Sequence, residues 1–297
     1  MENQAVPPQS IPSFQQYVED RKYIKNVSPK TLLWYSDVWK AFGPHLEPFL
    51  ASGGRLNDSL KGAITSLLSR GVRPVSINSY LTGVRAYLNW LHAEQWLKEK
   101  PRVQLLKYEH KVIATFSPEQ VQRLLNFKPR GTNQTRTHIA TCVMLDSGLR
   151  LSEVLELKIA DIDFDNLLLK VKGKGNKQRL VPMSNELRRI LYRHSTRQKD
   201  VILLFGTRCG TRATNRNFLR DFKDLCTRLR ITGVRASPHT LRHTFAVGYL
   251  RAGGNLFYLS KILGHTSVKT TERYLQSVQA GDLQAVHSKL SLLSGRG

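Results

Sequence analysis

The sequence predicts a mainly helical protein with one small β-sheet, divided into two domains. Apolar residues recur at helical spacing through the first hundred residues, and a basic stretch without clear periodicity follows over residues 98–115. The second half is again mostly helical, apart from one pair of extended apolar segments. Because 297 residues are enough for two domains, we expect a helical domain over residues 1–108 and an α+β domain over 109–297.

The first domain is predicted to be a small helical bundle. Ser28 and Pro29 supply an N-cap and a proline at the first helical position, which is a common helix start. Two helical stripes follow: Leu32, Tyr35, Val38, Trp39 and Phe42 in the first, and Ile77, Tyr80, Leu81, Val84, Leu88 and Leu91 in the second. Between them, glycines bound a shorter helix over residues 56–70.

The second domain is predicted to open with a helix and to contain one β-hairpin. Ser117, Pro118 and Gln120 have the spacing of a capping box. Residues 167–171 and 179–183 are apolar and extended on either side of a glycine-containing turn at 173–176, which is the pattern of a hairpin. At the end of the chain, an amphipathic tail helix is predicted from Leu283, Val286, Leu290 and Leu293.

The charge of the chain indicates a polyanionic partner. The sequence has 46 Lys and Arg against 22 Asp and Glu, a formal net charge of +24. These basic residues are spread from Arg21 to Arg296, and no apolar run approaches the roughly 20 residues of a membrane span, so nucleic acid is favoured over a membrane surface. Three cysteines without metal-ligand spacing and the absence of a secretory signal lead us to expect a cytoplasmic protein.

Six residues are candidates for a catalytic site, although each alone has an ordinary explanation. Arg150 could be a charged residue at a helix start, Lys174 a solvated turn lysine, and Tyr274 a core tyrosine. His239 and Arg242 could be an ordinary exposed pair on one helix face, and His265 a helix-end residue with local hydrogen bonds. The full set is Arg150, Lys174, His239, Arg242, His265 and Tyr274.

Together these side chains match the needs of phosphodiester exchange. Two guanidiniums can bind the non-bridging oxygens and stabilise the charge of a pentacoordinate phosphorus. A phenol is a poor nucleophile at neutral pH, so it needs a base or a positive pocket, and His239 and His265 can supply either. Lys174 can protonate the departing 5′ oxygen. No carboxylate cluster for Mg²⁺ is evident near these residues, so we expect neither a metal nor another cofactor.

The motifs around these residues resemble those of the tyrosine recombinases of the phage integrase family, with the size and layout of the Xer recombinases. The resemblance runs over most of the chain and is strongest in residues 147–153, 173–182, 239–246 and 263–274. The order of the candidates agrees with the family, as do the spacings of 24 residues from Arg150 to Lys174, 23 from Arg242 to His265 and 9 from there to Tyr274.

The resemblance implies a role for each candidate. Tyr274 would form a 3′-phosphotyrosyl bond, Lys174 would act as general acid, and His239 would act as general base. Arg150 and Arg242 would hold the phosphate, His265 would hydrogen-bond it, and Glu153 would be a supporting acidic residue that orients the site.

The resemblance also implies an architecture and partners. The fold would be a two-domain, C-shaped clamp on double-stranded DNA, with a helical, SAM-like core-binding domain and a catalytic domain that carries the tail helix. Four protomers would act on two inverted-repeat sites through a Holliday junction, with a possible accessory or directionality factor. The short segment before the first stripe leads us to expect no additional arm-binding domain.

The subclass has several candidates. Residues 275–282 depart from the usual Xer tail, which favours an integrase of a mobile genetic element. Xer-type resolution of chromosome or plasmid dimers is the alternative. A type IB topoisomerase would use the same chemistry without joining two sites, and a DNA-binding protein with a decayed site would not keep the complete residue set.

Overall fold

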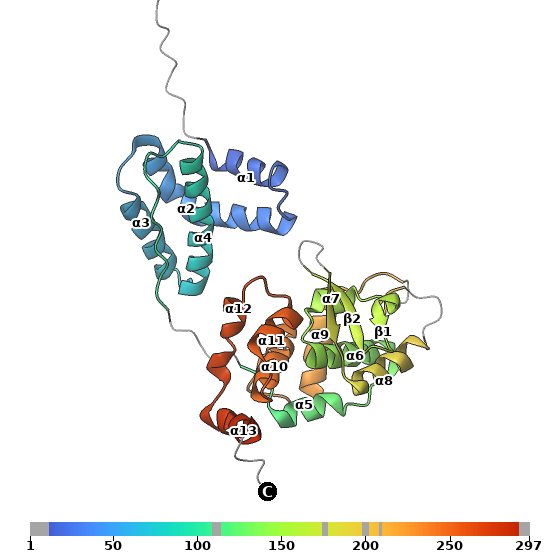
Figure 1. Ribbon diagram of the computed structural model, residues 1–297. Helices are drawn as coiled ribbons and strands as arrows, with labels where there is room; N and C mark the ends of the chain where they lie inside the picture. The colour runs from blue at the N-terminus through green and yellow to red at the C-terminus, as the bar shows by residue number, and fades with distance from the viewer. Residues whose placement is uncertain (1–11, 109–113, 174–177, 198–201, 208–209, 291–297) are drawn as a thin grey trace, which may run out of the picture. The chain divides into compact units, whose positions relative to one another are not determined.

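The computed structural model describes residues 12–108, 114–173, 178–197, 202–207 and 210–290, with side chains up to residue 288. It forms two compact units, Met1–His110 and Lys111–Gly297 (Figure 1). The described residues are mainly helical and contain one three-stranded antiparallel sheet, which confirms the predicted fold class. The roles of the two units stay predictions.

The first unit is a bundle of four helices. They are α1 (Phe14–Tyr23), α2 (Pro29–Ser52), α3 (Leu56–Ser69) and α4 (Pro74–Ala93). Ser28 caps α2 as predicted, since its hydroxyl accepts from the N–H of Thr31. The helix continues beyond its predicted stripe, through Pro44 and Pro48, because buried Leu46 extends the apolar face that Tyr35, Val38 and Phe42 begin.

Helix α1 precedes the first predicted stripe and was not expected as a separate element. Ser13 and Gln16 form a capping box at its start. Only Phe14 and Tyr17 are buried from this helix, and two positions are too few to produce a visible periodicity. Their rings join an aromatic core, in which Phe14 stacks on Trp39 with ring centroids 4.5 Å apart.

Part of the predicted linker belongs to the first unit. The side chain of Asn78 on α4 donates to the carbonyl of Leu106 at 2.9 Å and accepts from its N–H at 2.8 Å. Val103 is buried against the same bundle. These backbone-like hydrogen bonds hold the chain after α4 along that helix, a contact that composition alone did not indicate. Residues 109–113 lie outside the described part of the chain.

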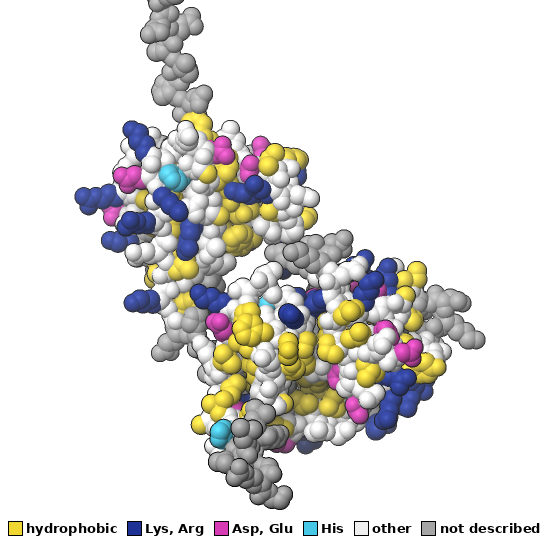
Figure 2. Space-filling view, viewed as in Figure 1, with side chains coloured by type: hydrophobic (Ala, Val, Ile, Leu, Met, Phe, Trp, Pro, Cys, Tyr) yellow, Lys and Arg dark blue, Asp and Glu magenta, His cyan; other side chains and the backbone are white. Residues whose placement is uncertain are grey.

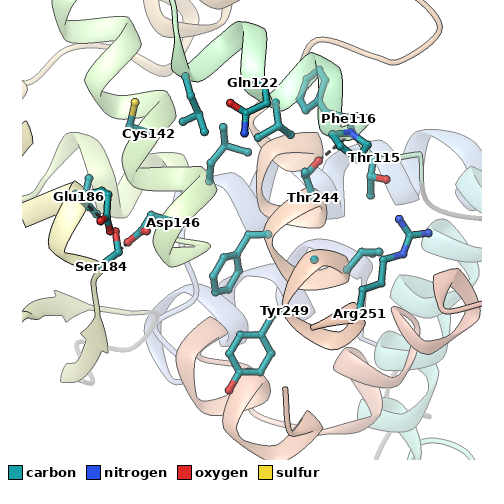
Figure 3. Close-up of a pocket in the computed structure, with 18 of the residues that line it drawn as sticks. Thr115, Phe116, Gln122, Cys142, Asp146, Ser184, Glu186, Thr244, Tyr249 and Arg251 are labelled. Atoms are coloured by element: carbon teal, nitrogen blue, oxygen red, sulfur yellow. Dashed lines mark hydrogen bonds between the residues drawn. The ribbon is translucent and has the colours of Figure 1, made fainter. Parts of the chain in front are cut away.

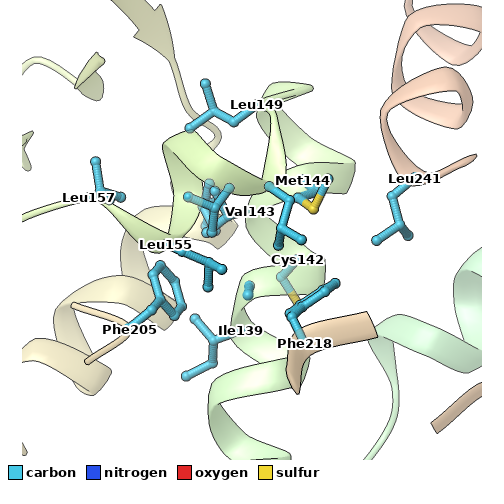
Figure 4. Packing of buried hydrophobic residues seen from close by; sticks show 14 of the residues in the cluster. Ile139, Cys142, Val143, Met144, Leu149, Leu155, Leu157, Phe205, Phe218 and Leu241 are labelled. Atoms are coloured by element: carbon cyan, nitrogen blue, oxygen red, sulfur yellow. The ribbon is translucent and has the colours of Figure 1, made fainter. Parts of the chain in front are cut away.

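The second unit is built around helix α6. Its helices are α5 (Pro118–Leu125), α6 (Gly131–Ser147), α7 (Leu151–Leu155), α8 (Asn185–Ser195), α9 (Asn215–Arg228), α10 (Pro238–Arg251), α11 (Leu256–Leu263), α12 (Lys269–Glu272) and α13 (Ala280–Leu290). Helix α6 contacts α5, α7, α8, α9 and α10. Its side chains are therefore buried on several faces, as Figure 4 shows for Ile139, Val143 and Met144.

The predicted hairpin is confirmed as strands β2 (Leu168–Lys172) and β3 (Gln178–Pro182), with Leu168 opposite Pro182 and Lys172 opposite Gln178. A short strand that was not predicted, β1 (Ile162–Asp163), pairs with the other edge of β2. Two residues are too few to show alternation in a sequence. The predicted turn, with Lys174, lies outside the described residues.

Gly148 ends α6 and brings three helices together. Its φ of 64° lies in the left-handed region, which glycine adopts without the clash that a Cβ causes. A Cβ at this position would also collide with the ring of Phe245 on α10 and approach Leu263 of α11 to 2.9 Å. The turn therefore requires glycine both for its backbone conformation and for the close packing of α10 and α11.

We expect Gly148→Ala to destabilise the second unit more than Gly233→Ala. Gly233 has a similar φ of 77° but nothing within 4 Å of a Cβ, so both variants carry a strain of about 1–2 kcal/mol. Only the change at Gly148 adds roughly 1–3 kcal/mol of overpacking. Urea unfolding of the full chain, followed by circular dichroism, measures the difference.

The first unit supplies an internal control for this experiment. All four tryptophans lie within it: Trp34, Trp39, Trp90 and Trp96. The tryptophan fluorescence transition should therefore be the same in the wild type and in both variants. Equal losses of stability at Gly148 and Gly233 would contradict the packing argument.

Candidate active site

The guanidinium of Arg242 lies at the centre of the predicted site. Ser237 caps α10 and Pro238 occupies its first position, so Arg242 falls in the second turn. Its side chain is buried and donates to the carbonyl oxygens of Gly148 and Leu263, both at 2.7 Å. These carbonyls terminate α6 and α11, where the helix dipoles are negative. Burial, followed by the charge of Arg150, lowers the pKa of Arg242 to about 10, so it stays protonated at neutral pH.

Glu153 on α7 organises the other two arginines. Its buried carboxylate accepts from Arg150 Nη1 at 2.9 Å and from the Arg150 backbone N–H at 2.8 Å. Arg179 on β3 binds the same carboxylate with two parallel hydrogen bonds of 2.9 Å. Burial alone would raise the pKa of Glu153, but the hydrogen bonds from Arg179 and Arg150 outweigh it and lower this pKa, so the group is ionised.

Arg150 keeps part of its side chain accessible to solvent. Its side chain is 38% exposed, compared with 14% for Arg179. Besides its contacts with Glu153, Arg150 donates to the carbonyl of Gly264 at 3.3 Å. Gly264 has a φ of 63°, in the region that favours glycine, and a Cβ there would lie 2.9 Å from the guanidinium carbon of Arg179. Arg150 therefore has exposed donors available to an anion, whereas Arg179 is committed to the protein.

His265 joins this cluster in a defined tautomer. Its Nε2 lies 3.1 Å from Arg242 Nη2, and its Nδ1 lies 2.8 Å from the hydroxyl of Thr271. Burial, followed by the charges of Arg242 and Arg150, lowers the pKa of His265 to about 4, so the ring is neutral at pH 7. A guanidinium can only donate, so Nε2 accepts and Nδ1 carries the proton that it donates to Thr271.

Tyr274 is buried and its hydroxyl has a histidine partner. The side chain is 2% exposed, and its oxygen lies 3.1 Å from Nδ1 of His243. Burial raises the pKa of Tyr274, although the charges of Arg242 and Arg273 act in the opposite direction. His239, which was predicted as the general base, is exposed one turn before His243 on α10. Its ring centroid lies 6.4 Å from that of His243, and among the described residues it makes no hydrogen bond to Tyr274.

The structure thus brings together Arg150, Glu153, Arg242 and His265. It places the Tyr274 hydroxyl beside His243, the residue that follows Arg242 on α10. Lys174 lies outside the described residues. The nearby strand β3 does bring Arg179, five residues later, to Glu153.

Sequence reasoning missed three residues of the cluster, namely Arg179, His243 and Thr271. His243 could have been found, because it lies four residues after His239 and so shares a helix face with it. Arg179 lies within the hairpin motif, but a contact between a strand and Glu153, 26 residues earlier, leaves no local signal. Thr271 is fully buried on short helix α12, and its link to His265 depends on the turn that Gly264 begins.

A separate apolar cavity of about 570 Å³ lies between α5, α6, α8 and α10. Figure 3 shows Phe116, Cys142, Asp146 and Tyr249 around it. None of the predicted site residues that the structure describes lines this cavity, so the chemistry proposed from the sequence has no role for it.

The charge of the visible surface agrees with an anionic partner. Figure 2 shows more Lys and Arg than Asp and Glu side chains on the visible face of each unit. Across the described ranges, no group of three His, Cys, Asp or Glu side chains could hold a metal ion. In the same part of the chain, every helix is too short or too polar to cross a membrane.

Comparisons with known proteins place the chain in a family. The model of the phage integrase family matches residues 114–280. Tyrosine recombinase XerD of Oceanobacillus iheyensis is 26% identical over 231 residues, which cover 74% of this chain and 77% of the relative. Tyrosine recombinase XerC of Chlamydia muridarum is 28% identical over 302 residues, which cover 89% and 93%.

A solved structure shares the fold. The integrase of transposon Tn1549, in complex with a circular intermediate DNA, matches with a TM-score of 0.73 at 20% identity, covering 93% of this chain and 99% of that one. The family match spans more than half of the chain and includes the five described candidates as well as Lys174. The chain therefore belongs to the phage integrase family and is a tyrosine-type site-specific recombinase.

Proposed function

We propose that this recombinase cuts DNA by attack of the Tyr274 oxygen on a phosphodiester. The main support for the proposal is the cluster of Arg150, Arg242 and His265. Next to it, the Tyr274 hydroxyl lies 3.1 Å from His243. The new bond joins phosphorus to the tyrosyl oxygen on the 3′ side, and the bond to the 5′ oxygen breaks. Tyr274 loses its proton to a base, for which His239 is the candidate, and Lys174 protonates the 5′ oxygen. Reversal with a second strand rejoins the DNA without another source of energy.

The charge balance of the cluster favours phosphate binding. The cluster contains three guanidiniums, of Arg150, Arg179 and Arg242, and one carboxylate, which Arg150 and Arg179 bind, while His265 is neutral. The local excess of positive charge is suited to a phosphodiester and to the further negative charge of its transition state. A phosphate oxygen that replaces His265 as the acceptor of Arg242 would also raise the pKa of His265 and allow it to donate.

Among the subclasses, we propose integration of a mobile genetic element through a Holliday junction, carried out by four protomers on two inverted-repeat sites in the cytoplasm. The support is the segment after Tyr274, residues 275–282, which departs from the usual Xer tail. The second candidate is dimer resolution, which is favoured by the relatives named XerD and XerC. Sequencing the DNA that flanks the gene decides between them. A pair of inverted-repeat sites, one on each side of the gene, would mark a mobile element that carries it, whereas the lack of such a pair would favour dimer resolution.

The tail helix α13 lies against its own unit in the structure. Asp282 pairs with Arg251 at 3.2 Å, and Val286 packs beside Gly253. Leu283 on the same predicted stripe is 62% exposed, and the side chain of Leu290 and all of Leu293 lie outside the described residues. A partly exposed ion pair of this kind stabilises by about 1 kcal/mol or less. Release of the helix therefore costs little, and we propose that it docks on a neighbouring protomer during synapsis.

We expect Tyr274→Phe to abolish the covalent DNA adduct while DNA binding stays within about twofold, because only the nucleophilic oxygen is lost. The measurement is a denaturing gel of a nicked suicide duplex that carries the inverted repeats flanking the gene, run with EDTA present. The wild type should form the adduct in EDTA, and Tyr249→Phe, which also removes one phenol oxygen from the same unit, should behave like the wild type. An adduct in the Tyr274→Phe variant would refute the assignment.

Lys174→Ala should separate the general-acid role from a simple DNA contact. The variant should cleave ordinary DNA poorly but recover on a duplex with a 5′-bridging phosphorothioate, because a thiolate leaves without needing a proton. Lys172→Ala, on the exposed end of β2, is the matched control and should cleave both substrates alike. Equal impairment of Lys174→Ala on both substrates would rule out proton donation.

Deletion of residues 282–297 should leave single-site DNA binding nearly unchanged but eliminate cooperative synapsis and recombination. Leu283→Ala should reproduce part of that loss, and its exposed neighbour Gln284→Ala should not. Gel shifts and a two-site recombination assay measure the two properties. Full recombination by the truncated protein would reject docking on a neighbour, and loss of single-site binding would show that the helix serves its own unit.

A further inference from the structure

The face of α10 that meets Tyr274 changes from apolar to polar along the helix. Ala246, Val247 and Leu250 are buried and form a cluster with the Tyr274 ring. One turn toward the N-terminus, this face continues with the partly buried ring of His243. The tyrosine ring therefore lies on the apolar part while its oxygen reaches the histidine.

The contact with His243 gives the buried Tyr274 hydroxyl a hydrogen-bond partner. A hydroxyl enclosed by apolar side chains needs a hydrogen-bond partner, and leaving one unpaired is costly. The Tyr274 hydroxyl lies 3.1 Å from Nδ1 of His243, and the centroids of the two rings are 5.5 Å apart. Arg242 also acts on this hydroxyl through a side-chain hydrogen bond, which opposes the rise that burial causes in the pKa of Tyr274.

We propose that His243 is the residue that positions the nucleophile, by holding the Tyr274 hydroxyl through Nδ1 in the DNA-free enzyme. His243 immediately follows Arg242 on α10, so one helix turn carries both a phosphate ligand and the holder of the nucleophile. The distance between the tyrosyl oxygen and the phosphate is thereby tied to a single rigid element. This role differs from that of a general base, for which His239 stays the candidate, and it rests on the proposed nucleophilic function of Tyr274.

The electrostatic surroundings of His243 favour holding over proton removal. Burial, followed by the charges of Arg273, His239 and Arg242, lowers the pKa of His243 to about 4. Such a ring is neutral at pH 7 and can accept the phenolic hydrogen bond, but it is a weak base toward a phenol whose own pKa is raised.

Two substitutions separate the hydrogen bond from the basicity. Asparagine at position 243 can place an amide atom near the position of Nδ1 but cannot act as a base, whereas phenylalanine keeps the ring and has no polar atom. On the nicked duplex with the flanking repeats, we expect His243→Phe to form the covalent adduct roughly tenfold more slowly. His243→Asn should recover most of that loss, and the DNA dissociation constant should be unchanged in both variants. The ratio of each variant's rate to the wild-type rate should be constant between pH 6 and 8.

If the Asn and Phe variants lost adduct-formation rate equally, or if the rate ratio changed with pH, the positioning role would be wrong and His243 would be assigned to proton removal. Wild-type rates in His243→Phe would overturn any role for the contact. If the wild-type protein forms no adduct on this duplex, that result counts against the proposed function and not against the contact.

A measurement without DNA tests the contact itself. In full-length protein labelled with carbon-13 at the tyrosine ring carbon that bears the oxygen, the resonance lost in Tyr274→Phe identifies Tyr274. Substitution of His243 by Phe should shift that resonance, and substitution by Asn should shift it less. No shift in His243→Phe would show that the hydrogen bond is absent in solution, and thermal unfolding of each variant shows whether the unit stays folded.

Discussion

The guanidinium of Arg242 is buried against the carbonyl oxygens of Gly148 and Leu263, and much of the second unit is arranged around that contact. The two carbonyls are at the ends of α6 and α11, where backbone acceptors have no partner within their own helix. A single planar donor group satisfies both and fixes α10 relative to them. The positive φ of Gly148 makes this possible, because it turns the chain so that its carbonyl faces α10. A residue proposed for phosphate binding is therefore also a structural link between three helices.

Glu153 extends the same arrangement to the sheet. Its carboxylate joins Arg150, at the start of α7, to Arg179 on β3, and Arg179 reaches on to the carbonyl of Ile262 on α11. Buried charges of this kind are stable as a set, whereas removing one partner leaves an uncompensated charge. Strand β3 is thus anchored to Glu153 and to α11 through Arg179.

Two sides of α10 have different proposed roles, one in binding phosphate and the other in positioning Tyr274. Consecutive residues of a helix point about 100° apart, so Arg242 faces the ends of α6 and α11 while His243 faces Tyr274. His265 connects the two regions, since Nε2 accepts from Arg242 and Nδ1 donates to Thr271, three residues before Tyr274. A change at the phosphate site can therefore reach the segment of the nucleophile through two hydrogen bonds.

The sequence by itself determined the fold class, the hairpin and the helices marked by capping and periodicity, because these features are local. It also singled out six candidate residues by motif and spacing, and their roles stay predictions. It did not reveal α1, which buries only Phe14 and Tyr17, or β1, which has two residues. Only the tertiary structure decided that Arg179 shares Glu153 with Arg150, and that His243, not His239, meets the Tyr274 hydroxyl. The physical reason is that these contacts join residues 26 and 31 positions apart, and their partners are chosen by how buried polar groups are satisfied when helices pack.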